Sequence, residues 1–387
     1  MEEKKAKGIP VFIGVACVWM GTHFGPGVAS GTQITVYYVK YGLAGVFCSI
    51  IAMAILGCVL FCAAEYSRIY KTYDYESWIT GVYGKKWAVI LFDIAFAMVC
   101  CTALGGSLNA VATLLNSMLG FNYWLGVAIV IICTILLCIF GANLVRVSSS
   151  YMMFIVMGIL ILITIVVAAK GDGSLSESIA QQRENLPDAM NWGKGIVRAF
   201  VYAGFQATMI GSIAAVSGDL TCRSEVKKAT VFGFIGNSAM LIMLSLLLFS
   251  FTCRFDIMGE SLPLFTVLQR LGMNWFSWIY VITVFIAVLS TAVGFCFSGA
   301  SRFGRYYRNK AEGADNSKRD AIFIGCLLLA TAAASRFGIM ALVSVGTTIL
   351  GYLDIPILII PAVVLGGYKI RKQYLIDHHI DLTGIDK

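Results

Sequence analysis

Charged residues are scarce in this chain of 387 residues: they make up 13% of it, against roughly a quarter in ordinary soluble domains. Apolar residues account for 59%, and the mean hydropathy is +0.83. Apolar runs long enough to cross about 30 Å of hydrocarbon recur along the chain, without the alternation that is typical of barrel strands. The composition therefore predicts an all-α integral membrane protein and excludes a soluble domain.

Other absences narrow the function. The chain has three His and no apparent nucleophile–base set, so we expect no enzyme and no organic cofactor. A Walker-type phosphate loop is missing, which excludes direct use of ATP. An ion channel is the alternative to a transporter, but the sequence has no ring of like polar residues that repeats as a channel filter requires. The 12 Cys form no CxxC pair and lie mostly in apolar runs, so we interpret them as packing residues.

Ten apolar spans are predicted, with a long polar connector at 170–194 between the fifth and the sixth. Residues 337–352 form either a separate short helix or a part of the tenth span. The predicted spans are 9–39, 42–66, 86–116, 122–141, 147–169, 192–220, 227–253, 274–304, 319–335 and 354–370.

Basic residues predict the orientation in the membrane. With a cytoplasmic N-terminus, 21 of the 29 Lys and Arg lie in or beside inside segments. We therefore expect both termini to be cytoplasmic and the chain to lie in the cell membrane. The net charge of +8 then reflects topology and contact with anionic membrane lipid, and no nucleic-acid partner is expected. The first apolar run is too long for a cleavable signal peptide.

Two spans are interrupted near their middle. The stretch THFGPGVASGTQ at 22–33 breaks span 1, and YAGFQATMIGS at 202–212 interrupts span 6. A helix opened within the membrane offers amides to an anion and carbonyls to a cation. Paired breaks in two halves, which must insert in opposite senses, indicate the central site of a transporter. The alternative, close helix packing through glycine, applies most to Gly204 and Gly211.

The first break resembles a family signature. GTHFGPGVASGTQ is similar to GxxxGAGFASGQE, the first-helix motif of the YkvI-type membrane proteins. That family is similar to the amino acid–polyamine–organocation transporters of the LeuT fold. The resemblance implies one transporter domain over 1–387, with inverted five-helix repeats at 1–170 and 192–370, discontinuous helices 1 and 6, and a cytoplasmic tail at 371–387. Gln33 replaces the usual Glu, which removes one carboxylate that could couple protons. The matching positions are Gly21, Gly25, Gly27, Ala29, Ser30 and Gly31.

Span 8 contains FIAVLSTAVGF, whose spacing places one carbonyl and two hydroxyls on one helical face. The resemblance implies that this face meets carbonyls of the helix 1 break and holds a sodium ion, which neutral oxygens suit. Span 5 has no basic residue before Lys170, which favours sodium over the lysine found in some proton-coupled relatives. Alternatively, both hydroxyls bond back to carbonyls one turn earlier. The expected sodium ligands are Gly25, Val28, Ala287, Ser290 and Thr291.

The substrate site is expected across the two breaks. Amides of helix 1 suit a carboxylate, a ring at Tyr202 or Phe205 suits an amine or an apolar body, and Gln206 both donates and accepts. Because no charge lies in either break, a small amino-acid-like zwitterion fits this site best. Together with the sodium site that the resemblance implies, this predicts a sodium-coupled symporter of such a solute. The alternative is proton-coupled or exchange transport of an organic cation or amine. The expected substrate residues are Gly27, Ala29, Ser30, Gly31, Tyr202, Gly204, Phe205 and Gln206.

The remaining polar residues have open roles. His23 couples protons or makes a structural hydrogen bond. Asp93, inside span 3, is a coupling carboxylate or reaches an inside-facing Lys or Arg. Asp354 is interpreted as interfacial at the start of span 10, and His378 with His379 as a weak metal-binding pair.

Overall fold

The computed structural model describes residues 10–139, 142–308 and 317–377, and every regular element in those ranges is a helix. Within them, six helices are long and apolar enough to cross a membrane: Leu43–Tyr70, Ala88–Leu119, Trp192–Asp219, Arg223–Phe249, Asn274–Gly304 and Gly338–Asp377. Two shorter apolar helices are Val11–His23 and Tyr123–Cys138, and Phe154–Lys170 forms a pair with Leu175–Asn185 that is bent by 96°. The chain is a multi-pass helical membrane protein.

The first five spans are α1–α3, α4, α6–α7, α8 and α9. The elements of this half are α1 (Val11–His23), α2 (Pro26–Ala29), α3 (Thr32–Tyr37), η1 (Val39–Tyr41), α4 (Leu43–Tyr70), α5 (Tyr75–Tyr83), α6 (Ala88–Val99), η2 (Cys100–Leu104), α7 (Gly105–Leu119), α8 (Tyr123–Ile139) and α9 (Ala142–Lys170).

The other five spans are α11–α12, α13, α15, α16 and α17–α19. The elements of this half are α10 (Leu175–Asn185), α11 (Trp192–Gln206), η3 (Ala207–Met209), α12 (Ile210–Val216), η4 (Ser217–Asp219), α13 (Arg223–Phe249), α14 (Pro263–Arg270), α15 (Asn274–Tyr307), α16 (Ser317–Ser335), α17 (Gly338–Ala341), η5 (Leu342–Gly346), α18 (Thr347–Asp354), η6 (Ile355–Ile359), η7 (Ala362–Gly366) and α19 (Gly367–Asp377).

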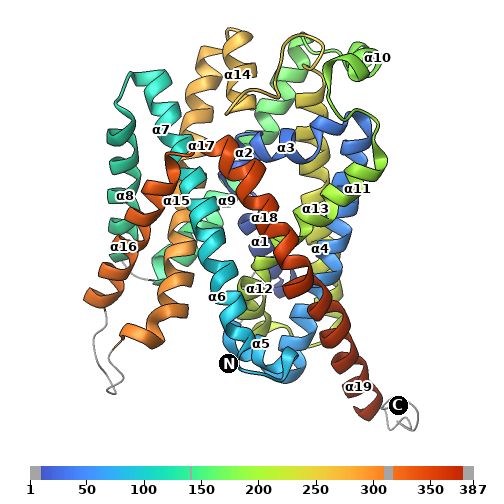
Figure 1. The fold of residues 1–387 in the computed structure, drawn as a ribbon, viewed down its shortest axis with the longest axis vertical. Helices are drawn as coiled ribbons and strands as arrows, with labels where there is room; N and C mark the ends of the chain where they lie inside the picture. The colour runs from blue at the N-terminus through green and yellow to red at the C-terminus, as the bar shows by residue number, and fades with distance from the viewer. Residues whose placement is uncertain (1–9, 140–141, 309–316, 378–387) are drawn as a thin grey trace, which may run out of the picture.

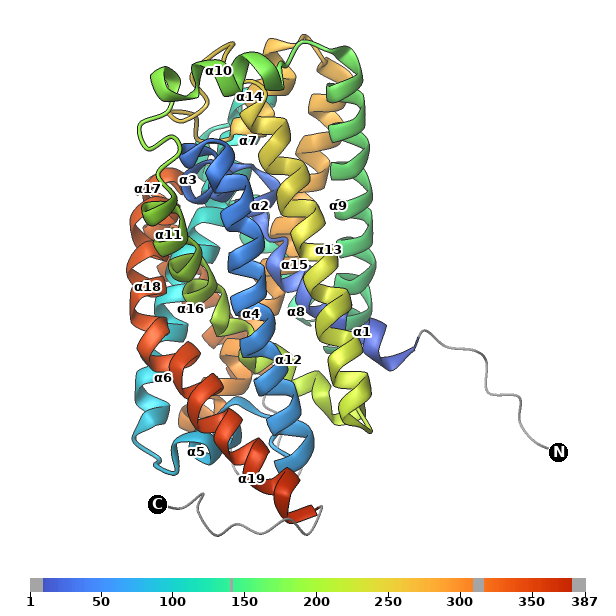
Figure 2. The ribbon, with the colours of Figure 1, turned by 90° about the vertical axis from the view of Figure 1, so that its right-hand side faces the viewer.

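The spans stand side by side in one bundle (Figure 1). We call the end that carries α10 and α14 the upper end, and the end that carries α5 and α19 the lower end. Figure 2 shows α1 rising from the lower half towards α3, whereas α11 descends from the upper half towards α12. The first spans of the two halves therefore run in opposite directions, as an odd number of spans per half requires.

Span 1 is broken where the sequence predicts. α1 ends at His23, Gly25 is extended (φ −72°, ψ 179°), and α2 begins at Pro26, which has no N–H to leave unpaired. Gly31 has φ +83°, a left-handed conformation that glycine adopts without strain, and α3 follows it. The break is enclosed by protein, since Phe24 is 3% exposed, and this is the condition for irregular backbone at membrane depth.

Span 6 is interrupted less. Its α-helical turns tighten to a 3-10 turn at η3 and resume in α12, so the helical path from Trp192 to Asp219 is continuous. Gly204 lies against the backbone of Gly351 in α18, and Gly211 lies against the ring of Tyr75, so that a Cβ at either glycine would collide. Close packing against neighbouring segments, the alternative given for Gly204 and Gly211, therefore accounts for both glycines.

The tenth span is longer than predicted. It runs from Gly338 to Asp377 and contains three π-helical turns, so residues 337–352 belong to it almost entirely. The interfacial position predicted for Asp354 was wrong: the helix continues from Gly338, and Asp354 is 0% exposed inside it. Helix α19 extends through residues 371–377 of the expected tail. His378 and His379 lie outside the described residues.

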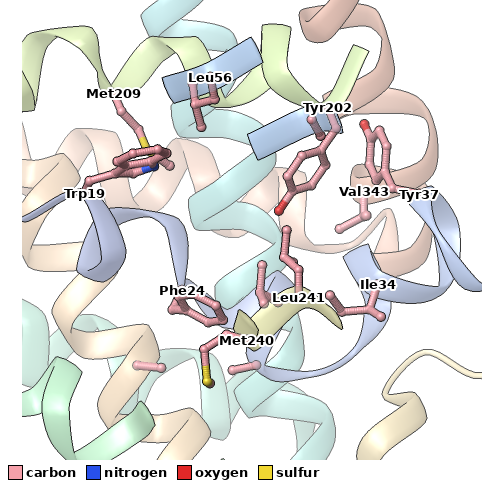
Figure 3. Packing of buried hydrophobic residues seen from close by; sticks show 14 of the residues in the cluster. Trp19, Phe24, Ile34, Tyr37, Leu56, Tyr202, Met209, Met240, Leu241 and Val343 are labelled. Atoms are coloured by element: carbon pink, nitrogen blue, oxygen red, sulfur yellow. The ribbon is translucent and has the colours of Figure 1, made fainter. Parts of the chain in front are cut away.

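Buried aromatic residues fix span 1 against its neighbours. Trp19 of α1 rests on Gly233 of α13, where the missing side chain makes room for the indole. Tyr37 of α3 packs edge-on against Tyr202 of α11, with ring centroids 4.9 Å apart (Figure 3). Since apolar association in lipid depends on close packing, these contacts hold the broken helix in position.

Candidate functional site

A cavity of about 420 Å³ lies beside the break in span 1. Spans 1, 3, 6, 8 and 10 contribute to its wall, and its described lining contains no Asp, Glu, Lys or Arg. Its polar side-chain groups are hydroxyls, amides, one thiol and one imidazole. Lining residues include Thr22, His23, Gly25, Gly27, Gln33, Phe96, Thr102, Ser107, Phe205, Gln206, Ser212, Ser290, Thr291, Phe295, Ser298 and Thr347.

The cavity brings together part of each predicted site. Among the expected substrate residues, Gly27, Phe205 and Gln206 line it, whereas Ala29, Ser30, Gly31, Tyr202 and Gly204 are buried behind the lining. Among the expected sodium ligands, Gly25, Ser290 and Thr291 line it, whereas Val28 and Ala287 do not. His23 is a lining residue and Asp93 is not.

The amides expected to hold a carboxylate are already bonded. The N–H groups of Ala29, Ser30 and Gly31 each donate to a carbonyl within residues 25–28, at 2.8–3.0 Å. Because α2 is a single turn, its own carbonyls and that of Gly25 take up the amides that follow. A carboxylate at these three positions would have to displace an existing hydrogen bond.

The unpaired backbone groups lie closer to Gly25. Among the described residues, no N–H donates to the carbonyls of residues 21–24, and the amides of Gly25 and Gly27 have no acceptor. The Gly25 carbonyl accepts two N–H groups, and the Val28 carbonyl accepts that of Gly31. The two carbonyls expected to bind sodium are therefore used inside the break, and the open carbonyls lie about one turn earlier, at the end of α1.

The hydroxyls of Ser290 and Thr291 face the cavity without helix bonds. Earlier on α15, Ser277 and Thr283 donate to carbonyls four residues before them, at 3.1 and 2.7 Å. No described group is bonded to the Ser290 or Thr291 hydroxyl, so the alternative of back-bonding does not describe them. A Cβ built on Gly25 would lie 3.4 Å from Thr291 Oγ1, which places span 8 in direct contact with the break.

A buried hydrogen-bond network joins spans 1, 6 and 7. His23 Nδ1 lies 2.6 Å from Asn237 Oδ1, and His23 Nε2 lies 2.8 Å from Tyr202 Oη. Gln206 Nε2 donates to Tyr202 Oη at 3.2 Å, and Gln33 Oε1 lies 3.3 Å from that oxygen. His23 thus makes structural hydrogen bonds, Gln206 carries the network to the cavity wall, and Gln33 lies beside the same hydroxyl.

Most of the cavity lining was missed by the sequence reasoning, and two of the missed residues, Gln33 and Thr347, have buried polar partners. Gln33 is 8% exposed and lines the cavity, and its replacement of the Glu in the family motif was the available signal. Thr347 also lines the cavity, and its Oγ1 lies 2.7 Å from Tyr37 Oη. Thr347 carried no signal, because it lies in the stretch whose membership of span 10 was undecided.

Asp93 has a structural partner. Arg302 of α15 donates to its carboxylate at 2.5 Å, and the two side chains are 14% and 8% exposed, with Arg302 the more buried. The guanidinium also lies 3.8 Å from the ring centroid of Tyr75. Of the two roles expected for Asp93, the structure shows a pairing with an Arg, whereas the membrane side on which Arg302 lies stays a prediction.

The cavity opens towards the lower end. Its exposed lining residues, Thr22, Gly294 and Ser298, lie on the parts of α1 and α15 between the break and the lower end. On the opposite side, Ile339 and Val343 of span 10 are buried, at 1% and 4% exposed. The structure therefore represents a conformation with one-sided access.

The segment before α14 closes the other side. Thr32 Oγ1 donates to the Ser261 carbonyl at 2.7 Å, and the N–H of Leu264 donates to the Ser30 carbonyl at 3.2 Å. Residues 30–32, expected in part to bind substrate, instead bind this segment. The hydrogen bonds attach the upper part of span 1 to the connection between α13 and α15.

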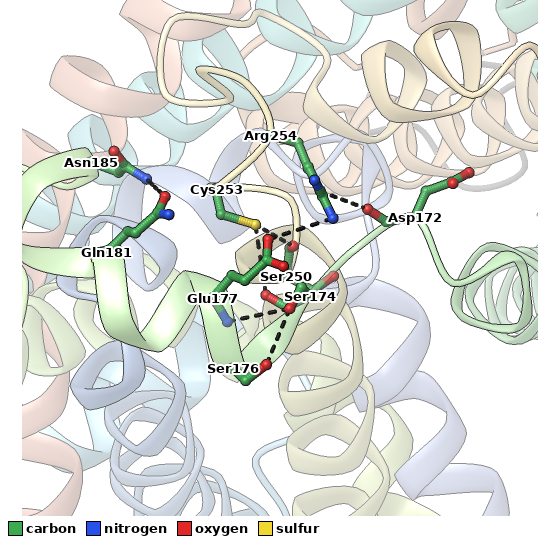
Figure 4. Close-up of polar contacts among 9 residues, drawn as sticks. All are labelled: Asp172, Ser174, Ser176, Glu177, Gln181, Asn185, Ser250, Cys253 and Arg254. Carbon is green, nitrogen blue, oxygen red and sulfur yellow. Dashed lines mark hydrogen bonds and ion pairs between the residues drawn. The ribbon is translucent and has the colours of Figure 1, made fainter.

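Helix α10 lies over the upper end, as part of the long polar connector. Arg254 donates to the carbonyl of Asp172 at 3.1 Å and pairs with Glu177 at 3.5 Å (Figure 4). The N–H of Ser174 donates to the carbonyl of Ser250 at 2.9 Å, at the end of α13. These contacts fix α10 to the end of span 7 and add a second layer above the closed side of the cavity.

No family model matches the chain, and no curated protein matches its sequence. Several solved structures share its fold. MhsT in complex with L-phenylalanine has a TM-score of 0.64 at 16% identity and covers 96% of this chain and 99% of its own. A manganese transporter of Eremococcus coleocola has a TM-score of 0.65 at 12% identity, covering 94% and 80%. A substrate-bound sialic acid symporter, described as Na⁺-coupled, has a TM-score of 0.62 at 13% identity, covering 90% and 77%.

These similarities show the fold. The chain has the LeuT fold, with two inverted five-helix repeats, and its structural neighbours are transporters rather than enzymes. The YkvI-type resemblance stays a prediction.

Proposed function

We propose that the chain is a secondary active transporter that carries a small amino-acid-like zwitterion by alternating access, coupled to sodium. The observation that carries this proposal is the cavity beside the break in span 1, which is largely apolar, with hydroxyl and amide groups among its lining but no carboxylate, ammonium or guanidinium in the described part of it. A net-neutral solute can enter such a site without leaving an unbalanced buried charge. One-sided access supports alternating access, because the opposite side is closed by hydrogen bonds that a second conformation can exchange.

The sodium site is proposed at the lower side of the break. The open carbonyls at residues 21–24 and the unbonded hydroxyls of Ser290 and Thr291 are neutral oxygen ligands on two walls of one cavity. Such ligands suit a monovalent cation without a formal counter-charge. A structural neighbour, the sialic acid symporter, is Na⁺-coupled, which supports the same coupling here.

The carboxylate of the solute is proposed to bind at Gly25 and Gly27, whose amides have no acceptor among the described residues. Its amine or apolar body would contact Phe205 and the amide group of Gln206. The neighbour MhsT binds L-phenylalanine, which supports an amino acid as the solute. In the described chain no three His, Cys, Asp or Glu side chains gather as metal ligands, which favours a zwitterion over the metal carried by the manganese transporter.

An organic cation or amine is the second candidate for the solute. Phe96, Phe205 and Phe295 line the cavity, and aromatic faces can hold a cation without a carboxylate.

We propose that the protein lies in the cell membrane with both termini cytoplasmic, because 21 of the 29 basic residues then lie inside. The cavity described here would then open to the cytoplasm.

The proposal is tested with L-phenylalanine and its methyl ester, in sodium or potassium chloride. We expect the free amino acid to raise the thermal unfolding midpoint of the purified protein in sodium, and the ester, which lacks the carboxylate, to do so much less. Uptake of a panel of labelled amino acids into proteoliposomes is then compared in sodium and in potassium chloride. Equal binding of acid and ester would refute carboxylate recognition, and equal uptake in potassium and sodium that follows a pH gradient would refute sodium coupling.

A further inference from the structure

Asp354 is a carboxylate in span 10 that none of the interactions described above uses. Its side chain is 0% exposed, and neither of its oxygens has a hydrogen-bond partner among the described residues. An ionised carboxylate buried without a partner costs several kcal/mol, and such a group takes up a proton instead. The environment in this conformation therefore suits the neutral acid and not the carboxylate.

Asp354 faces the interior of the bundle. The buried face of α18 consists of Thr347, Leu350, Gly351 and Asp354, at the three- and four-residue spacing of one helical side. On the other side of the same helix, Tyr352 is 52% exposed. An intramembrane carboxylate that faces the bundle is a candidate functional group, and snorkelling to the membrane surface does not explain this one.

Two irregular helical segments meet next to Asp354. It is followed directly by the π-helical turn η6, and η6 packs against η3, the 3-10 turn of span 6. One turn before Asp354, Leu350 is buried in a cluster with Phe205 and Val99, and both of these line the cavity. Turns of these two kinds within helices mark places where a helix can change shape. A rearrangement of spans 6 and 10 would therefore alter the surroundings of Asp354 and of the cavity wall together.

Among the described residues, no charged side chain is bonded to Asp354. Lys194 pairs with Asp188 nearer the upper end, and Arg302 pairs with Asp93. Tyr75 of α5 lies within electrostatic range of both Asp354 and Arg302 but makes no hydrogen bond with Asp354. Among the described residues, the titratable or charged side chains on α18 and on the helices packed against it are Tyr352 on α18, Lys194, Arg198 and Tyr202 on α11, and Asp93 on α6. Close by, Tyr83 of α5 donates to the Ile357 carbonyl of η6, and Arg302 of α15 lies over the ring of Tyr75.

We propose that Asp354 is a proton-binding site that is protonated while the cavity opens to the lower end and gives up its proton when spans 6 and 10 rearrange. One proton from water converts the carboxylate into the neutral acid and returns to water on release, and no other bond changes. The conformation seen here then becomes less populated as pH rises, because only the protonated side chain can stay buried. The inference rests on the proposed function, because alternating access supplies the second conformation in which Asp354 loses its proton. It requires neither sodium nor a particular solute.

The first test is infrared spectroscopy of the full chain in lipid vesicles at neutral pH. Labelling aspartate with ¹³C at the side-chain carboxyl identifies its C=O stretch without changing the sequence. We expect one protonated aspartate per chain, a band that disappears in Asp354→Asn and is unchanged in Asp219→Asn, at an exposed position of η4. Absence of a protonated aspartate band in the wild type, or its persistence in Asp354→Asn, would overturn the inference.

The second test follows the conformation without any solute. A chain that keeps Cys17, which lines the cavity, as its only cysteine is labelled with a water-soluble maleimide at increasing pH. In Asp354→Asn we expect the labelling rate to change with pH only through ionisation of the Cys17 thiol. The wild-type rate divided by that of the variant should fall, by up to about tenfold per pH unit for one linked proton. A constant ratio would overturn the inference, whereas sodium-independent uptake would refute only the proposed coupling ion.

Discussion

His23 Nε2 lies 2.8 Å from the hydroxyl of Tyr202, so the last residue of α1 is joined to α11 in the middle of the bundle. Asn237 Nδ2 donates to the Gly233 carbonyl at 2.8 Å, which leaves its Oδ1 to accept from His23 Nδ1. This assignment from the network makes Nε2 of the neutral ring the acceptor for the Tyr202 hydroxyl. The two interrupted spans are therefore joined by a short hydrogen bond between two buried side chains.

Removal of that hydroxyl should destabilise the protein. We expect Tyr202→Phe to lower the free energy of unfolding by about 1–3 kcal/mol, because buried partners on His23 and Gln206 lose their hydrogen bonds. Tyr280→Phe is the matched control: Tyr280 is equally buried, with one hydrogen bond of 3.3 Å to the Ala29 carbonyl. Thermal unfolding of the purified variants measures both. A larger loss in Tyr280→Phe would contradict this account of the network.

Removal of the two free hydroxyls should weaken sodium binding. We expect the double variant Ser290→Ala, Thr291→Ala to need about tenfold more sodium for the same thermal stabilisation, which corresponds to about 1.4 kcal/mol. Thr283→Val serves as the control on the same helix, because its hydroxyl bonds to the Ile279 carbonyl at 2.7 Å. Titrations with sodium chloride against potassium chloride give the result. If the double variant and wild type respond alike, the sodium site lies elsewhere.

The ion pair in span 3 should be structural. We expect Asp93→Asn to cost about 3–5 kcal/mol of stability, because it leaves the charge of Arg302 buried and unpaired. The double variant Asp93→Leu, Arg302→Met removes both charges and should be the more stable of the two. Chemical denaturation in mild detergent compares them. A double variant that folds well but loses transport entirely would return Asp93 to the list of coupling candidates.

The crossing of α11 and α18 should tolerate no side chain at Gly351. A Cβ there would collide with the backbone of Val201, so we expect Gly351→Ala to cost about 1–3 kcal/mol, as overpacking does. Gly158→Ala is the matched change within a helix, at an exposed position with no atom near its Cβ. It should be neutral or stabilising by up to about 1 kcal/mol. Equal effects of the two substitutions in thermal unfolding would refute the close contact.

Asp188 should make stability depend on acid pH. It accepts hydrogen bonds from Lys194 at 2.7 Å and pairs with Lys40 at 2.9 Å, and these contacts lower the pKa of its carboxyl. A lowered pKa in the folded state stabilises the protein above the ordinary pKa of aspartate, and that stabilisation is lost as pH falls through the lowered value. The difference in unfolding midpoint between wild type and Asp188→Asn should therefore shrink on acidification. A difference that grows in acid would contradict the assignment.

Local features were predictable because each depends on a short stretch of sequence. The break at Gly25 and Pro26 follows from residues that are costly in a helix interior, and the structure ends α1 at His23. The free hydroxyls of Ser290 and Thr291 were expected on the cavity side of span 8, and they line the cavity.

Register within the break was less predictable. The sequence reasoning assigned free amides to residues 29–31, whereas α2 forms one turn and uses them. Which carbonyls and amides stay open depends on the exact residue at which each short helix begins and ends. Such boundaries are the least certain part of any reading of a sequence.

The sequence by itself determined that this protein is a helical membrane protein with about ten spans, a broken first helix and no charged residue in either break, because each of these properties depends on residues that are neighbours in the chain. Only the tertiary structure decided which polar side chains have partners. Asp93 meets Arg302 from span 8, His23 meets Tyr202 from span 6, and Asp354 meets no partner among the described residues. The physical reason is that hydropathy reports the cost of burying a group, whereas the compensating contact comes from a segment far away in the chain.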